Sequence, residues 1–69
     1  MNEEIYMGQL LNCLLLDSTV VVLDENGTEC WRGPVRRYPW TMLDCQVMEV
    51  SSRDGLVHVA TDSKRDDWR

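Results

Sequence analysis

Apolar residues recur at helical spacing along the first part of the chain, with polar residues between them. The apolar positions are Ile5, Met7, Leu10, Leu11, Leu14 and Leu15. A repeat of three to four residues places them on one broad face of an α-helix. Asn2 can act as the N-cap, and Glu3 and Glu4 suit the positive end of the helix dipole. The pattern predicts an amphipathic helix over residues 2–16, which Gly8 weakens.

Two pairs of β-branched, apolar runs follow the helix. The predicted strands cover residues 19–24, 28–32, 45–51 and 56–61. Asn26-Gly27 separates the first pair and Asp54-Gly55 the second. Both dipeptides suit a type I′ turn, in which both central residues have positive φ, and Asn26-Gly27 is the stronger signal. The pattern therefore predicts two β-hairpins.

A two-residue turn would fix the register of the first hairpin. The opposed pairs would be Val22 with Trp31, Leu23 with Cys30, and Asp24 with Glu29. The last pair brings two carboxylates together, which a longer loop or a bulge would relieve. Both faces of this hairpin carry apolar residues. One face is expected to meet the helix, and the other needs a cover, for which a second copy of the chain is a candidate.

The second hairpin has one clear apolar face. That face would carry Met48, Val50, Val57 and Val59, and the opposite face Glu49, Ser51, His58 and Ala60. The expected fold is α+β: an N-terminal helix packed on a small antiparallel sheet of about four strands, with a proline-containing loop between the two hairpins. Residues 1–61 would form a single domain. Residues 62–69 would form a polar tail, disordered unless Trp68 anchors it.

Charge and composition narrow the class of protein. The 69 residues carry a formal net charge of −5, which argues against a general DNA- or RNA-binding surface. No strictly apolar run is longer than residues 13–16, and that length is far too short to span a membrane. The acidic start does not resemble a signal peptide, and three cysteines are an odd number for a disulfide framework. We therefore expect a cytoplasmic protein with free thiols.

Residues 31–40 depart most from their surroundings, because they hold three of the seven basic residues and no acid. The candidate ligand-binding residues are Arg32, Arg36, Arg37, Trp31, Tyr38 and Trp40. Guanidinium groups bind phosphate or carboxylate oxygens, and aromatic rings stack on bases. The segment therefore suits an anionic, nucleotide-like ligand. In the alternative interpretation, Trp31 and Trp40 fill the core of a domain without Phe, and the arginines pair with the surplus acids.

Metal binding and catalysis are less well supported by the pattern. Cys13, Cys30, Cys45 and His58 contain no Cys-x-x-Cys pair, so we predict buried thiols and no metal or other cofactor. Ser51 is expected opposite His58, but one Ser–His proximity does not make a catalytic site. We therefore predict a protein that is not an enzyme. The acidic residues favour solubility, or else mimicry of a nucleic acid toward a basic protein surface.

The chain resembles the small accessory proteins of bacterial phages and mobile elements. The resemblance rests on the Leu-rich opening, the run Val20–Gly27, the following Trp31-Arg32-Gly33 and the hairpin over residues 47–59. It implies an anti-defence role in a bacterial host and transfers no functional residue. The first hypothesis is a homo-oligomer that sequesters a nucleotide-like ligand. The alternative is an acidic inhibitor that docks on a larger defence protein such as a nuclease.

Overall fold

The computed structural model describes residues 4–68. The described chain contains one α-helix, α1 (Met7–Leu11). Its four strands are β1 (Thr19–Leu23), β2 (Glu29–Pro34), β3 (Val47–Arg53) and β4 (Leu56–Thr61). Three 3₁₀ turns complete it: η1 (Val35–Arg37), η2 (Trp40–Met42) and η3 (Arg65–Trp68). Helix and strands occur together as the α+β prediction requires, but strands dominate.

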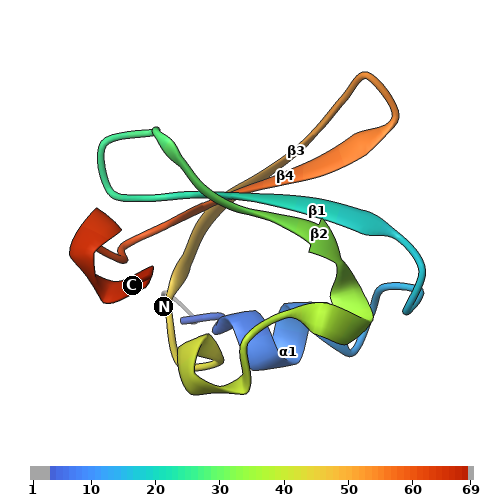
Figure 1. The fold of residues 1–69 in the computed structure, drawn as a ribbon, viewed down its shortest axis with the longest axis horizontal. Coiled ribbons are helices and arrows are strands. Elements are labelled where there is room, and N and C mark those ends of the chain that lie inside the picture. Colours follow the sequence, from blue (N-terminus) through green and yellow to red (C-terminus); the bar gives the residue numbers. More distant parts are fainter. Residues whose placement is uncertain (1–3, 69) are drawn as a thin grey trace.

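The four strands form one sheet in the order β2-β1-β4-β3. Each predicted hairpin is present as an antiparallel pair. The hairpins join through β1 and β4, which run parallel (Figure 1). The sheet is therefore mixed, and the prediction of a purely antiparallel sheet is wrong at this central join. The unbroken run Val20-Val21-Val22 is buried throughout, as is typical of a central strand with a parallel neighbour.

The helix α1 begins later than predicted because the residues before it pair with the segment that leads into β3. The Ile5 carbonyl accepts a hydrogen bond from the Val47 N–H at 2.7 Å. Tyr6 forms an antiparallel bridge with Gln46. Extended backbone at these positions excludes a helix there. Residues 2 and 3, the predicted cap and first helical residue, lie outside the described part of the chain.

The helix also ends earlier than predicted. After Leu11 the chain makes separate turns: the Leu14 N–H donates to the Leu11 carbonyl at 3.2 Å and the Ser18 N–H to the Leu15 carbonyl at 3.0 Å. Leu15 and Leu16 are exposed. The apolar stripe therefore contacts the core through Met7, Leu10, Leu11 and Leu14 but not at its two ends, Ile5 and Leu15. A helix this short depends on packing against the rest of the fold.

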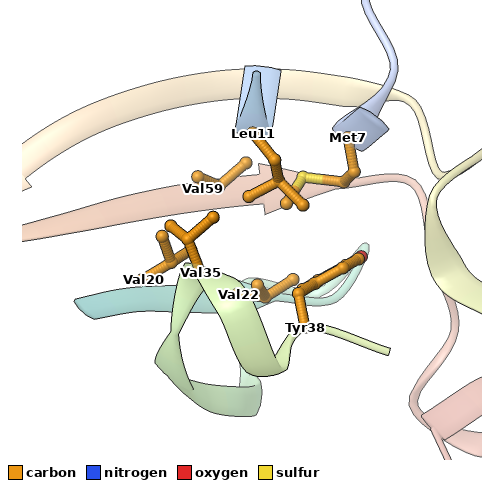
Figure 2. Close-up of a cluster of buried hydrophobic side chains, with 7 residues drawn as sticks. All are labelled: Met7, Leu11, Val20, Val22, Val35, Tyr38 and Val59. Atoms are coloured by element: carbon orange, nitrogen blue, oxygen red, sulfur yellow. The ribbon is translucent and has the colours of Figure 1, made fainter. Parts of the chain in front are cut away.

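The hydrophobic core lies between α1 and the inner face of the sheet, the face that points toward α1 (Figure 2). Its buried members are Met7, Leu11, Val20, Val22, Val35, Tyr38 and Val59. Val35 and Tyr38 come from the connection between β2 and β3. That connection, predicted as a binding loop, thus supplies part of the core.

The outer face of the sheet is covered at its centre within the single chain. Val21 points away from α1 but is only 1% exposed. Its register partners on the two neighbouring strands are Arg32 and His58. Val21 therefore lies between two residues with longer side chains on the neighbouring strands. The first hairpin therefore does not need a second copy of the chain to bury Val21.

The register of the first hairpin changes at a bulge. The predicted pairing holds for Val22, but Leu23 lies opposite Glu29, with an irregularity between Val22 and Leu23. The predicted pairs of Leu23 with Cys30 and of Asp24 with Glu29 are therefore wrong. The bulge removes the like-charge pair, as expected for this strand.

The loop of the first hairpin is not the predicted type I′ turn. The Asp24 N–H donates to the Thr28 carbonyl at 2.9 Å and closes a loop of three residues. Gly27 has φ +80°, whereas Asn26 does not have a positive φ. The buried Asp24 carboxylate accepts hydrogen bonds from the N–H groups of Asn26 (2.8 Å) and Thr28 (3.0 Å). This loop combines a side-chain-capped turn with a left-handed glycine.

The second hairpin has the predicted turn. Asp54 and Gly55 both have positive φ, 55° and 77°, and the predicted pairing holds from the turn back to Glu49. Beyond that, a bulge at Met48 interrupts it. Met48 is 61% exposed and Val50 49% exposed, so their predicted place in the core is wrong. The tip of this hairpin extends past the layer formed by α1 (Figure 1).

The segment after β4 packs on the domain. The Ser63 carbonyl accepts a hydrogen bond from the Glu25 N–H at 2.8 Å. The Ser63 hydroxyl accepts one from Trp68 Nε1–H at 3.0 Å. The Thr61 hydroxyl donates to the Leu23 carbonyl at 2.8 Å. Trp68 thus anchors the segment, which was one of the two alternatives predicted for it.

Candidate functional site

The aromatic residues of segment 31–40 divide between the core and the surface. Tyr38 is buried, and its hydroxyl donates to the Met42 carbonyl at 2.7 Å. Burial raises the pKa of Tyr38 above its ordinary value. The Trp31 ring packs edge-on against Tyr38, with ring centroids 5.3 Å apart. Trp40, in contrast, is 80% exposed.

Two of the three arginines of the segment form ion pairs on the surface. Arg32 contacts Glu29 at 2.8 Å and Arg36 contacts Asp17 at 2.7 Å. The hydrogen bond from Arg32 lowers the pKa of Glu29 and raises that of Arg32. Arg37 is exposed.

The six predicted residues therefore do not form one cluster. Neighbouring residues on a strand point to opposite faces, so Arg32 lies on the outer face while Trp31 lies on the inner one. Trp31 and Tyr38 are brought together, but as packing partners. Arg37 and Trp40 remain on the surface. The prediction of a core role thus holds for Trp31 but is wrong for Trp40, and the predicted ligand site stays a prediction.

An apolar groove lies beside α1, with a volume of about 650 Å³. Its lining residues are Tyr6, Gly8, Gln9, Leu11, Asn12, Leu43 and Asp44. The Gly8 N–H donates to the Leu43 carbonyl at 2.9 Å and holds the helix close to the segment after η2. A Cβ on Gly8 would lie 3.6 Å from Leu43, in ordinary contact. We call this surface the α1 groove.

Two further hollows lie side by side near the C-terminal segment. The first, the acidic hollow, has a volume of about 540 Å³ and is lined by Thr41, Met42, Asp44, Cys45, Asp62, Ser63 and Asp67. The second, the aromatic hollow, has a volume of about 260 Å³ and is lined by Trp31, Pro39, Thr41, Met42, Asp67 and Trp68. The two share Thr41, Met42 and Asp67. Together they place carboxylates next to indole rings.

The cysteines are free, and two of them are partly buried. Burial, with a smaller effect from the charge of Asp24, raises the pKa of Cys30 to about 11. Burial and then the charges of Asp62 and Asp44 raise the pKa of Cys45. Both thiols are therefore protonated near neutral pH. A protonated thiol is a weak nucleophile. Cys13 is exposed.

Ser51 and His58, the pair considered for catalysis, lie on the neighbouring strands β3 and β4. Ser51 lies opposite His58 in the β3–β4 register, as predicted. Within residues 4–68, no three His, Cys, Asp or Glu side chains gather closely enough to hold a metal ion. No helix in that part of the chain combines the length and apolar character needed to cross a bilayer.

Comparison with known proteins identifies no relative of this chain. No protein family, curated protein or solved structure matches the chain. The surface features above therefore carry the functional argument. Sequence reasoning missed the α1 groove and the aromatic hollow, because both depend on residues distant in the chain. The signals that existed were Leu43, an apolar residue directly before Asp44, and Trp68, an aromatic residue in an otherwise polar tail.

Proposed function

We propose that this protein is a non-enzymatic protein-binding module whose docking surface is the α1 groove. The observation that carries the proposal is an exposed groove with an apolar lining from Tyr6, Leu11 and Leu43. Exposed apolar surface with a polar rim is typical of protein-interaction sites. Ile5, next to the groove-lining Tyr6, is also exposed. An aromatic and aliphatic surface of this kind suits an apolar anchor residue of a partner.

The charge of the molecule favours a partner with a basic surface. Asp44 lies in the groove lining, and Glu4 accepts a hydrogen bond from the Tyr6 hydroxyl. With a net charge of −5 over the chain, such a surface would accelerate association with a positively charged protein. This matches the hypothesis of an acidic inhibitor of a larger host protein, such as a defence nuclease of a bacterial cell.

Photo-cross-linking followed by affinity measurement would test the proposal. A photoreactive phenylalanine in place of Tyr6 should capture a partner from a bacterial lysate, and the purified partner should bind the wild-type chain. Leu43→Lys should weaken that binding at least about tenfold, because it places a charge in an apolar contact. Leu16→Lys is the matched control, since Leu16 is also an exposed leucine but does not line the α1 groove. Equal losses for both variants would argue against the α1 groove.

The nucleotide-like ligand remains the second proposal. It is supported by Arg37 and Trp40, which are exposed three positions apart. In that case Arg37→Ala should abolish binding of a nucleotide that changes Trp40 fluorescence, while Arg53→Ala, an equal loss of charge on β3, should not. A response shared by both variants would indicate general charge attraction alone.

Homo-oligomerisation also stays a proposal, and its most suitable surface differs from the one expected. The outer face around Val21 is already covered, whereas Met48 and Val50 on β3 are exposed. β3 is one of the two edge strands of the sheet. Exposed edge strands with apolar residues favour pairing between copies.

A further inference from the structure

The aromatic hollow has a lining suited to a positively charged group, the opposite of the ligand expected from the sequence. Trp31 and Trp68 both contribute to its lining, together with the apolar side chains of Pro39 and Met42. The faces of indole rings attract cations more strongly than those of other aromatic side chains. The hollow lies between β2, the segment around η2, and η3, so three parts of the chain meet there.

The two indole rings are held in place before any ligand arrives. Both pack edge-on against Tyr38, with centroid distances of 5.3 Å for Trp31 and 5.7 Å for Trp68. Trp68 Nε1–H also donates to the buried Ser63 hydroxyl. Gly33 makes room for the other ring, because a Cβ there would lie only 3.1 Å from Trp31. Fixed rings lower the entropy cost of binding.

One carboxylate completes the lining. Asp67 Oδ2 accepts a hydrogen bond from the Lys64 backbone N–H at 3.0 Å, which fixes its position at the start of η3. The ion pairs found within residues 4–68 are Arg32–Glu29 and Arg36–Asp17, so no cationic side chain of that region pairs with Asp67. Within that region its negative charge is therefore not neutralised.

The neighbouring acidic hollow adds to this negative field. It shares Asp67 with the aromatic hollow and adds Asp44 and Asp62. Three carboxylates next to two indoles repel an anion and attract a cation. A small inorganic cation would keep its water and gain little from the rings. An alkylated ammonium group is more weakly hydrated and matches aromatic faces, as quaternary ammonium sites do.

We propose that the aromatic hollow binds an organic ammonium group, with Trp31 and Trp68 contacting its alkyl substituents and Asp67 compensating its charge. The group is either that of a free alkylamine or that of a modified lysine side chain on a protein. This site is separate from the α1 groove, so it does not depend on the proposed docking surface.

Nuclear magnetic resonance titration of the full chain would test this site. The chain has three tryptophans and hence three indole N–H signals. Tetramethylammonium chloride should shift the Trp31 and Trp68 signals saturably. The exposed Trp40, which does not line the hollow, should respond much less. tert-Butanol, a neutral molecule of similar shape, should produce no comparable shift, because cation–π attraction requires the charge.

A pair of variants tests the contribution of the Asp67 charge to binding. Asp67→Asn keeps an oxygen that can accept from the Lys64 N–H but removes the charge, so tetramethylammonium affinity should fall about tenfold. Asp54→Asn is the matched control. It removes the same charge at the tip of the β3–β4 hairpin, far from η3 (Figure 1), and should leave the affinity unchanged.

The outcomes separate the possible sources of the ligand. A peptide with trimethyllysine that binds more tightly than free tetramethylammonium would assign the site to a protein side chain, whereas equal affinities would assign it to a small molecule. Either result supports the site. Equal shifts with tert-butanol, equal effects of the two Asn variants, or unmoved Trp31 and Trp68 signals would overturn it.

Discussion

The two hairpins carry nearly the same turn dipeptide, yet they turn in different ways. Asp54-Gly55 forms the type I′ turn that the sequence predicts, with both residues at positive φ. Asn26-Gly27, the stronger signal, forms a three-residue loop in which only the glycine has positive φ. The difference lies in what surrounds each turn.

The first loop belongs to the packed interior, and the second stands apart from it. Asp24 is buried and binds two backbone N–H groups of its own loop. The next residue, Glu25, donates its N–H to Ser63 of the C-terminal segment. The Asp54-Gly55 tip projects away from the rest of the fold (Figure 1). A local turn preference therefore decides the conformation only where no distant contact competes with it.

The largest expected effect of a change in these turns is at Asp24. Asp24→Ala should lower the free energy of unfolding by about 2 kcal/mol, because two N–H groups lose their acceptor. Asp24→Asn should cost clearly less, since the amide oxygen can accept the same hydrogen bonds. Urea denaturation of both variants would measure this. If the two variants were equally destabilised, the carboxylate charge would matter more than its hydrogen bonds.

The glycines test whether the two turns differ in backbone strain. Gly27→Ala and Gly55→Ala should each cost about 1–2 kcal/mol, because φ values of +80° and +77° are unfavourable for a residue with a side chain. Neither added Cβ would meet another atom within 4 Å. Gly8→Ala is the control, and it should stabilise α1 by up to about 1 kcal/mol.

Thermal unfolding of the three glycine variants would make this comparison. A larger loss of stability for Gly27→Ala than for Gly55→Ala would show that the first loop, which contacts the C-terminal segment, relaxes less easily around an added side chain. A loss of stability for Gly8→Ala would mean that the added Cβ, 3.6 Å from Leu43, is not accommodated as an ordinary contact.

The smallest effect should come from exchanging the residue before each glycine. Asp54→Asn should stabilise the chain by a few tenths of a kcal/mol, because Asn is the preferred first residue of a type I′ turn. Asn26→Asp should be nearly neutral, because φ is not positive at that position. Denaturation midpoints of the two variants would show the contrast. A clear loss for Asn26→Asp would mean that its side chain contributes to the loop.

The same contrast between local and distant information explains what the sequence revealed. The hairpins and the register near Asp54-Gly55 follow from neighbouring residues, and both were predicted. The early end of α1 and the parallel β1–β4 pair depend on contacts between distant segments. The unbroken Val20-Val21-Val22 run was a clue to the central strand, because strands with one solvent-exposed face usually alternate.

The candidate sites divide in the same way. Segment 31–40 stood out by composition, but its side chains separate once Trp31 and Tyr38 enter the interior. The α1 groove needs Leu43 beside Gly8, and the aromatic hollow needs Trp68 beside Trp31. No rule of spacing along the chain connects those pairs.

The parallel pairing of β1 with β4 sets an order of events as the chain is made. The two central strands come from residues 19–23 and 56–61, so the middle of the sheet cannot form until β4 has been synthesised. Until then Val20–Val22 has a free edge on one side, and contacts between such distant segments form slowly. A ribosome-bound or truncated chain would present that apolar strand to its surroundings, where it would favour aggregation or chaperone binding. Folding of this small domain is therefore a collective event that waits for its last strand.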